Sequence, residues 1–230
     1  MKEAVAIARR EFHLYHECRE VREEISYDQE EMSTSLNLAL HGDGPQNIGK
    51  LNSGQMAVFD AIKQAIHGNG PKLIFIDARG GTGKTFLLNI VLCLVRTMGE
   101  DSIALATAFT GIAAQLLQGG RTFNSRFKYP LKPSKGQLCS ITKGSGIHKL
   151  IQKARLVLWD EAPMSNKEQV ESLNETFQDL MGNKDLFGGK VVVLAGDFRQ
   201  LPTVIPKGNR SQIVDASLKS SQLWNDFKVM

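Results

Sequence analysis

The residues Ala78–Thr85 have the types and the spacing that grip a phosphate group, in the order Ala-Arg-Gly-Gly-Thr-Gly-Lys-Thr. Glycines let backbone N–H groups curl round an anion, Lys84 offers a positive charge to the β- and γ-phosphate oxygens, and the Thr85 hydroxyl can bind Mg²⁺. The residues expected to contact the phosphates are Gly80, Gly81, Thr82, Gly83, Lys84 and Thr85. The loop therefore predicts an ATP site with Mg²⁺ as its metal. A glycine-rich turn without a ligand is the alternative, since Ala78 stands where the usual pattern begins with glycine.

Three further polar residues have the chemistry to complete the hydrolysis of ATP. Asp160 and Glu161 follow one apolar run, and Gln200 follows another. Phosphoryl transfer to water needs neutralised charge, a positioned water and a group that responds to the γ-phosphate. We expect Asp160 to hold Mg²⁺, Glu161 to orient and deprotonate the water, and Gln200 to hydrogen-bond a γ-phosphate oxygen. The predicted catalytic residues are therefore Lys84, Glu161 and Gln200; a purely structural Asp-Glu pair is the alternative.

Gln55 is a candidate for recognition of the adenine base. It lies in the first turn of a predicted helix, with Ser53 as its expected N-cap and apolar residues spaced three or four apart behind it. A primary amide can pair with both a donor and an acceptor on the adenine edge. A solvent-exposed glutamine without a ligand is the alternative.

These candidates lie at the ends of elements that must form a sheet. Four apolar runs, 73–76, 103–107, 156–159 and 191–195, predict strands separated by helical segments. Such an order specifies an α/β fold with a mostly parallel sheet flanked by helices, whose ligands gather at the carboxyl ends of the strands. Apolar residues three or four apart predict a further helix over 2–32, and His41–Pro45 predicts a linker. We expect residues 1–45 to form this helical extension and residues 46–230 to form one domain.

The composition places limits on the class of protein. With 42% hydrophobic and 23% charged residues in 230 positions, the chain can bury one globular core plus an appendage. The longest strongly apolar run, Phe86–Val95, is too short to span a bilayer, and no signal-peptide core is evident at the N-terminus. We therefore expect an intracellular protein with no membrane partner. Cys18, Cys93 and Cys139 have no paired spacing, which argues against a disulfide framework and a zinc site.

Basic residues gather in one part of the sequence. The net charge is +4, yet Ser102–Trp159 contains no Asp or Glu and nine Lys or Arg residues. A basic stretch beside an ATP site favours nucleic-acid binding, and a solvated basic face is the alternative.

Several motifs, taken in order, resemble those of superfamily-one DNA helicases. They are GGTGKT at 80–85, TAFTGIAA at 107–114, WDEAPM at 159–164, LFGGK at 186–190, GDFRQLP at 196–202 and IVDASL at 213–218. Within that superfamily they are most similar to the Pif family, especially the helicase domains of Helitron-type transposons. The resemblance covers residue 52 to the end of the chain.

The resemblance implies a RecA-like fold and ATP-driven 5′ to 3′ movement along single-stranded DNA. It gives Gln55 the role of reading adenine, and it agrees with the roles stated above for the phosphate loop, the acidic pair and Gln200. Segments 107–111 and 120–127 resemble strand-gripping motifs, and the expected DNA-binding residues are Thr107, Phe109, Thr110, Gly111, Asn124, Arg126 and Lys128. Aromatic side chains in this region could stack on bases, with core packing as the alternative: Phe109, Phe123, Phe127 and Tyr129.

The sequence also departs from the family pattern. Asn124 stands where histidine is common, and Thr203 where a second proline is frequent. Residues 227–230 resemble the start of another strand, and a second RecA-like domain with its arginine finger is missing. We expect the first motor domain of a helicase, with single-stranded DNA, duplex junctions and a second RecA-like domain as partners. Its implied setting is DNA repair, recombination, telomere maintenance or transposon replication, in the nucleus in preference to the mitochondrion. The alternative is a nucleotide-gated DNA-binding module or a transposon remnant without turnover.

Overall fold

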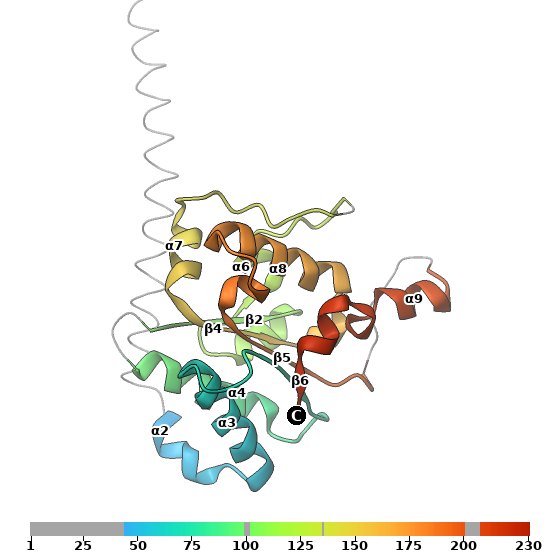
Figure 1. Ribbon diagram of the computed structural model, residues 1–230. Coiled ribbons are helices and arrows are strands. Elements are labelled where there is room, and N and C mark those ends of the chain that lie inside the picture. Colours follow the sequence, from blue (N-terminus) through green and yellow to red (C-terminus); the bar gives the residue numbers. More distant parts are fainter. Residues whose placement is uncertain (1–43, 99–101, 135, 201–207) are drawn as a thin grey trace, which may run out of the picture.

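The computed structural model describes residues 44–98, 102–134, 136–200 and 208–230 (Figure 1). The helix predicted over 2–32 lies outside the described residues, as do Thr203 and the last two residues of the 196–202 motif. Gly44–Asn47 forms the short helix α2, where the sequence predicts the end of a linker. Proline is tolerated in the first turn of a helix, so Pro45 is compatible with this turn.

Six parallel strands form one sheet in the order β3-β2-β4-β5-β1-β6. The strands are β1 (Leu73–Asp77), β2 (Ile103–Ala108), β3 (Arg121–Thr122), β4 (Ala154–Asp160), β5 (Val191–Gly196) and β6 (Lys228–Val229). The predicted α/β fold with a parallel sheet is confirmed. The sequence did not predict β3, because two residues are too few to show a strand pattern.

Helices cover both faces of this sheet (Figure 1). The α-helices are α3 (Ser53–Ile66), α4 (Lys84–Thr97), α5 (Gly111–Leu116), α6 (Phe123–Phe127), α7 (Gly146–Lys153), α8 (Lys167–Met181) and α9 (Arg210–Ala216). The 3₁₀ turns are η1 (Ile48–Lys50), η2 (Ala162–Met164), η3 (Leu186–Gly189), η4 (Leu218–Ser220) and η5 (Gln222–Asp226). Within these described segments, no helix is both long and apolar enough to cross a membrane.

Strand β1 shows how the two faces are built. Ile74 and Ile76 join a core with α3 and α4, whereas Leu73 and Phe75 join a second core with α8. Alternate side chains of a strand point to opposite faces, so a continuous apolar run is buried on both sides. The sheet is therefore a central layer between two helical layers.

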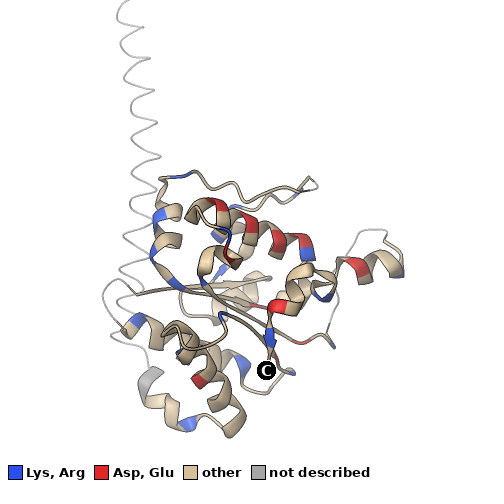
Figure 2. Cartoon of the chain, viewed as in Figure 1, with Lys and Arg blue, Asp and Glu red and all other residues tan. Residues whose placement is uncertain are grey.

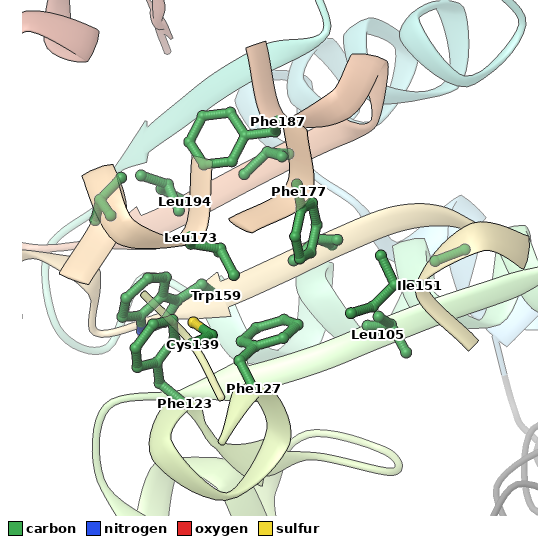
Figure 3. Packing of buried hydrophobic residues seen from close by; sticks show 14 of the residues in the cluster. Leu105, Phe123, Phe127, Cys139, Ile151, Trp159, Leu173, Phe177, Phe187 and Leu194 are labelled. Carbon is green, nitrogen blue, oxygen red and sulfur yellow. The ribbon is translucent and has the colours of Figure 1, made fainter. Parts of the chain in front are cut away.

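Trp159 of β4 organises the core on the α8 face (Figure 3). Its fully buried ring stacks on Phe123 of α6, with centroids 4.1 Å apart and an interplanar angle of 9°. Phe127 meets Phe177 of α8 edge to face at 5.6 Å. This aromatic packing fixes α6 against the carboxyl half of β4, directly beside the acidic pair.

The N-cap of α3 is Asn52 and not Ser53, which corrects the sequence prediction. Asn52 Oδ1 accepts from Gln55 N at 2.9 Å, and Gln55 Oε1 accepts from Asn52 N at 3.0 Å. This reciprocal capping box satisfies two N–H groups that a helix start otherwise leaves unpaired. It also fixes the position of Gln55.

The carboxyl ends of the central strands meet at one edge of the sheet. Asp77 lies opposite Gly196, and Ala108 lies opposite Asp160. A Cβ atom on Gly196 would lie 2.3 Å from Pro163 Cδ, so only glycine allows the turn after β4 to pack directly on the end of β5. The loops that carry the predicted chemistry are therefore held together by the sheet.

Candidate active site

The predicted phosphate loop connects β1 to the first turn of α4. Gly81 and Gly83 have φ values of 77° and 79°, a backbone conformation that glycine adopts without steric cost. Thr82 Oγ1 donates to the Arg79 carbonyl at 2.8 Å and ties the loop together. The helix that follows is anchored by buried apolar residues, so its N-terminus, with Lys84 and Thr85, is held at the end of β1.

Gln55 lies against this loop. Its Nε2 donates to the Thr82 carbonyl at 3.0 Å, and a Cβ on Gly83 would come within 2.7 Å of that nitrogen. An amide nitrogen has two N–H groups, so the bond to Thr82 uses one of them. Gln55 thus connects α3 to the phosphate loop, and its contact with adenine stays a prediction.

A pocket of about 410 Å³ opens between α3, β1 and the phosphate loop. Its lining includes Gln55, Val58, Asp77, Thr82, Leu87 and Arg199. Small-molecule sites usually occupy 300–1,000 Å³ and combine apolar walls with a few polar groups. The volume and the lining both fit a nucleotide.

Lys84 and Asp160 meet at the centre of the site. Lys84 Nζ lies 2.5 Å from Asp160 Oδ1, and the two side chains are only 16% and 5% exposed. The same carboxylate oxygen accepts from the Glu161 backbone N–H at 2.8 Å. The predicted phosphate residue and the predicted metal residue, 76 positions apart, are therefore brought together.

Gln200 also lies at the phosphate loop. A Cβ on Gly80 would lie 3.3 Å from Gln200 Nε2, which places this amide beside the loop backbone.

The neighbouring Arg199 bridges two carboxylates, with its guanidinium 3.2 Å from both Asp77 and Asp197. Sequence reasoning missed Asp77 and Arg199, although one ends the strand before the loop and the other precedes the predicted sensor. Their ion pair ties the loop after β5 to the start of the phosphate loop.

Glu161 is held by the turn that follows β2. Its Oε2 accepts from Thr110 Oγ1 at 2.7 Å and from Thr110 N at 3.2 Å. The residue has φ 57° and ψ 28°, a left-handed conformation that is strained for a non-glycine residue and occurs mostly at functional sites. The predicted base therefore touches a predicted DNA-binding residue, a contact that spacing alone did not indicate.

Three of the predicted DNA-binding residues are exposed to solvent. Phe109 is 36% exposed, and Gly111 and Lys128 are exposed as well. Thr110 and Asn124 are half-buried, and Asn124 Nδ2 donates to the Tyr129 carbonyl at 3.1 Å. Phe109, Gly111 and Lys128 are therefore the accessible members of the predicted set.

Two members of that set must be corrected. Thr107 is fully buried and donates through Oγ1 to the Leu158 carbonyl at 2.8 Å. Arg126 is 1% exposed, and its guanidinium donates to the carbonyls of Ala106 and Gly119 at 3.2 and 2.7 Å. Both side chains stabilise the fold through buried hydrogen bonds to backbone carbonyls, and neither reaches a surface that DNA could contact.

The aromatic candidates divide in the same way. Phe123, Phe127 and Tyr129 are at most 5% exposed and belong to the core, so the alternative of core packing is correct for them. Only Phe109 of the four remains partly accessible.

The described Lys and Arg residues of the segment 102–159 do not form one patch. Lys and Arg residues are spread over several elements (Figure 2). Lys128 follows α6 near the carboxyl ends of the strands, whereas Lys153 and Arg155 flank the first residue of β4 and so lie at the opposite edge. The absence of Asp and Glu from the segment 102–159 therefore suggests a larger DNA-binding face than the structure provides.

A paired substitution separates these roles. We expect Arg126→Ala to lower the free energy of unfolding by about 3 kcal/mol, because buried hydrogen bonds to a charged group contribute about 1.5–3 kcal/mol each. Lys128→Ala should leave stability nearly unchanged and reduce the salt slope of single-stranded DNA binding by about 0.7. Urea unfolding and binding titrations at several salt concentrations measure the two effects, with Arg155→Ala as an exposed arginine control. An Arg126→Ala protein of normal stability would contradict the assignment.

Most of the chain matches the model of one protein family. Residues 50–230 match the family model described as PIF1-like helicase, which is more than half of the chain. The chain belongs to the PIF1-like helicase family. The resemblance to the Pif family that the ordered motifs indicated is thereby confirmed.

Curated PIF1-like relatives extend well beyond the matched region. The chain is 30% identical over 162 residues to ATP-dependent DNA helicase Pif1 of Psychrobacter sp. (strain PRwf-1), covering 69% of this chain and 24% of that protein. It is 31% identical over 148 residues to ATP-dependent DNA helicase PIF1 of Candida albicans, covering 64% and 16%. The chain thus spans about a quarter or less of these relatives.

Solved PIF1-like structures share the fold. The Pif1 helicase from Bacteroides in complex with ADP-AlF3 and ssDNA aligns with a TM-score of 0.65 at 22% identity, over 78% of this chain and 41% of that chain. The Pif1 helicase from Candida albicans aligns with a TM-score of 0.60 at 24% identity, over 78% and 39%. The shared part is about two fifths of each solved chain.

Proposed function

We propose that residues 46–230 form the first RecA-like motor domain of an ATP-dependent DNA helicase that moves 5′ to 3′ on single-stranded DNA. The observation that carries this proposal is the assembly of Lys84, Asp160 and Gln200 around one phosphate loop. These side chains lie at or just after the ends of three different strands, and each has the chemistry that triphosphate hydrolysis requires. Membership of the PIF1-like helicase family supports the same conclusion.

The residues at the loop have separate roles in the proposed reaction. Lys84 and the loop N–H groups bind the phosphates, Glu161 accepts the proton of the attacking water, and Gln200 hydrogen-bonds the γ-phosphate. Thr85 and Asp160 would hold Mg²⁺, which neutralises phosphate charge when bound. In the part of the chain that the structure describes, no cluster of three or more His, Cys, Asp or Glu could hold a metal by itself. This donor set fits Mg²⁺, which takes one or two protein oxygens and completes its shell with phosphate and water.

Single-stranded DNA and duplex junctions are the proposed substrates. Exposed residues of the turn after β2 and Lys128 offer a contact surface beside the ATP site. One solved relative is a complex with ssDNA, and another concerns DNA unwinding at forked dsDNA by two coordinating Pif1 helicases. A second RecA-like domain is the proposed structural partner, because the solved relatives are more than twice as long as the shared part.

DNA repair, recombination, telomere maintenance and transposon replication are the settings that the family resemblance supports, with the nucleus as the proposed compartment. Each of these settings requires turnover of ATP with DNA. Binding of both ligands without turnover would instead identify a nucleotide-gated DNA-binding module or transposon remnant.

Lys84→Ala is expected to abolish ATP binding while the fold is kept. The lysine neutralises triphosphate charge, whereas its side chain adds little to the apolar core. ATP titration of the wild-type and variant proteins measures the loss, and circular dichroism checks the fold. Lys63→Ala, at an exposed position of α3, is the matched control. Wild-type affinity in the Lys84 variant would show that the loop does not hold the phosphates.

A further inference from the structure

The contact between Thr110 and Glu161 joins two elements that have different proposed tasks. Glu161 follows directly after β4 in the acidic pair, and Thr110 lies 51 residues earlier in the turn after β2. One carboxylate oxygen, Oε2, accepts both the Thr110 hydroxyl and the Thr110 N–H. Each carboxylate oxygen has about two acceptor positions, so this oxygen has no free position for a water.

The order of the strands shows in which direction the Glu161 side chain is turned. Strand β4 lies between β2 on one side and β5 with β1 on the other. The phosphate loop follows β1, and Asp160 reaches toward it to contact Lys84. Glu161 instead bonds to the turn after β2, on the side of β4 away from the phosphate loop. The two neighbouring carboxylates therefore point in different directions.

Thr110 couples this carboxylate to the surface. Its hydroxyl donates to Glu161 and accepts from the Ala113 N–H at 3.2 Å, which caps α5. A hydroxyl has one hydrogen to donate, so it cannot serve another acceptor while it holds Glu161. The residues on either side, Phe109 and Gly111, are exposed. A ligand that moves this turn must also move the hydrogen-bond donors of Glu161.

From this geometry we infer that Thr110 is a positioning residue that holds Glu161 turned from the phosphate loop until single-stranded DNA engages residues 109–111. This inference rests on the proposed function. DNA contact shifts the turn, the two hydrogen bonds break, and Glu161 becomes free to face the attacking water. The reaction itself is ordinary hydrolysis: water oxygen bonds to the γ-phosphorus, the bond to the bridging oxygen breaks, and Glu161 takes the water proton. ATP hydrolysis then waits for DNA.

The test measures ATP hydrolysis by the full-length protein with and without a dT oligonucleotide. Thr110→Val keeps the side-chain shape and removes the hydroxyl. The kcat without DNA should rise about tenfold, the factor that corresponds to one lost hydrogen bond to a charged group. The KM for ATP should stay constant, since no phosphate contact changes, and the ratio of DNA-stimulated to DNA-free rate should fall about tenfold.

Two further variants separate the hold on Glu161 from the cap of α5. Thr110→Ser retains both the donor and the cap, and it should restore the low DNA-free rate. Thr110→Asp retains an acceptor for the Ala113 N–H but cannot donate to Glu161, and it should raise the DNA-free rate at least as much as valine. A general loss of structure at α5 would lower the rates instead.

The outcomes distinguish this inference from the proposed function. A DNA-free kcat that falls or stays constant in Thr110→Val overturns the inference, while DNA-stimulated hydrolysis by the wild-type protein leaves the proposed function in place. Added DNA-free activity that survives in a Thr110→Val, Glu161→Gln double variant also overturns it, because the base then lies elsewhere. A wild-type protein with no ATP hydrolysis in the presence of DNA overturns the proposed function, and the inference fails with it.

Discussion

The 230-residue chain by itself is expected to hydrolyse ATP about 10³- to 10⁵-fold more slowly than a protein that adds a second RecA-like domain. An arginine supplied to the γ-phosphate from outside a motor domain contributes this factor in comparable NTPases. The chain's own Arg199, at the pocket, is already engaged with Asp77 and Asp197. Stepping along DNA also needs two grips whose separation changes with nucleotide state, and one domain has one grip.

ATPase and strand-separation assays on the chain, beside a protein extended through the second domain, measure this difference. ATP titration of the chain serves as the control, since nucleotide binding shows that the single domain is folded. Sedimentation experiments would establish whether the chain is a monomer. Robust unwinding by a monomer would contradict the requirement for a second RecA-like domain. Unwinding by a self-associated form would mean that another copy supplies the second half of the cleft.

Glu161→Gln is expected to lower kcat by about 10²- to 10⁴-fold while Mg-ATP binding persists, because the amide keeps the shape of the side chain but cannot accept the water proton. Steady-state hydrolysis with DNA present gives kcat, and ATP titration gives the affinity. Glu168→Gln, at an exposed position of α8, is the matched control. Asp160→Asn should instead weaken the dependence on Mg²⁺. A wild-type rate in the Glu161 variant would mean that another group takes the proton.

The sheet and the meeting of the strand ends could be predicted from the sequence because they rest on local patterns. Continuous apolar runs specify buried parallel strands, and polar residues at the ends of such strands must share one edge. This rule predicts that Lys84, Asp160 and Gln200 lie close together, and the structure places them around one loop.

The predictions that were wrong concern side chains whose burial depends on packing between distant segments. Arg126 lies in a segment of the sequence without Asp or Glu and resembles a DNA-binding residue, yet its guanidinium donates to the carbonyls of Ala106 and Gly119 inside the fold. Phe123 is buried because Trp159 of another element stacks on it. The bond from Thr110 to Glu161 spans 51 residues, and no spacing rule contains it.

The short contact between Lys84 and Asp160 makes the two ligands of the site dependent on each other. The charge of a carboxylate that is 5% exposed and paired with an ammonium is already balanced, so Mg²⁺ binding at Asp160 alters the charge balance of Lys84 as well. If ATP draws Lys84 to its phosphates, Asp160 needs Mg²⁺; if Mg²⁺ takes Asp160, Lys84 needs phosphate. Either ligand alone leaves one buried charge without a counter-ion, so each should raise the affinity for the other by the same factor.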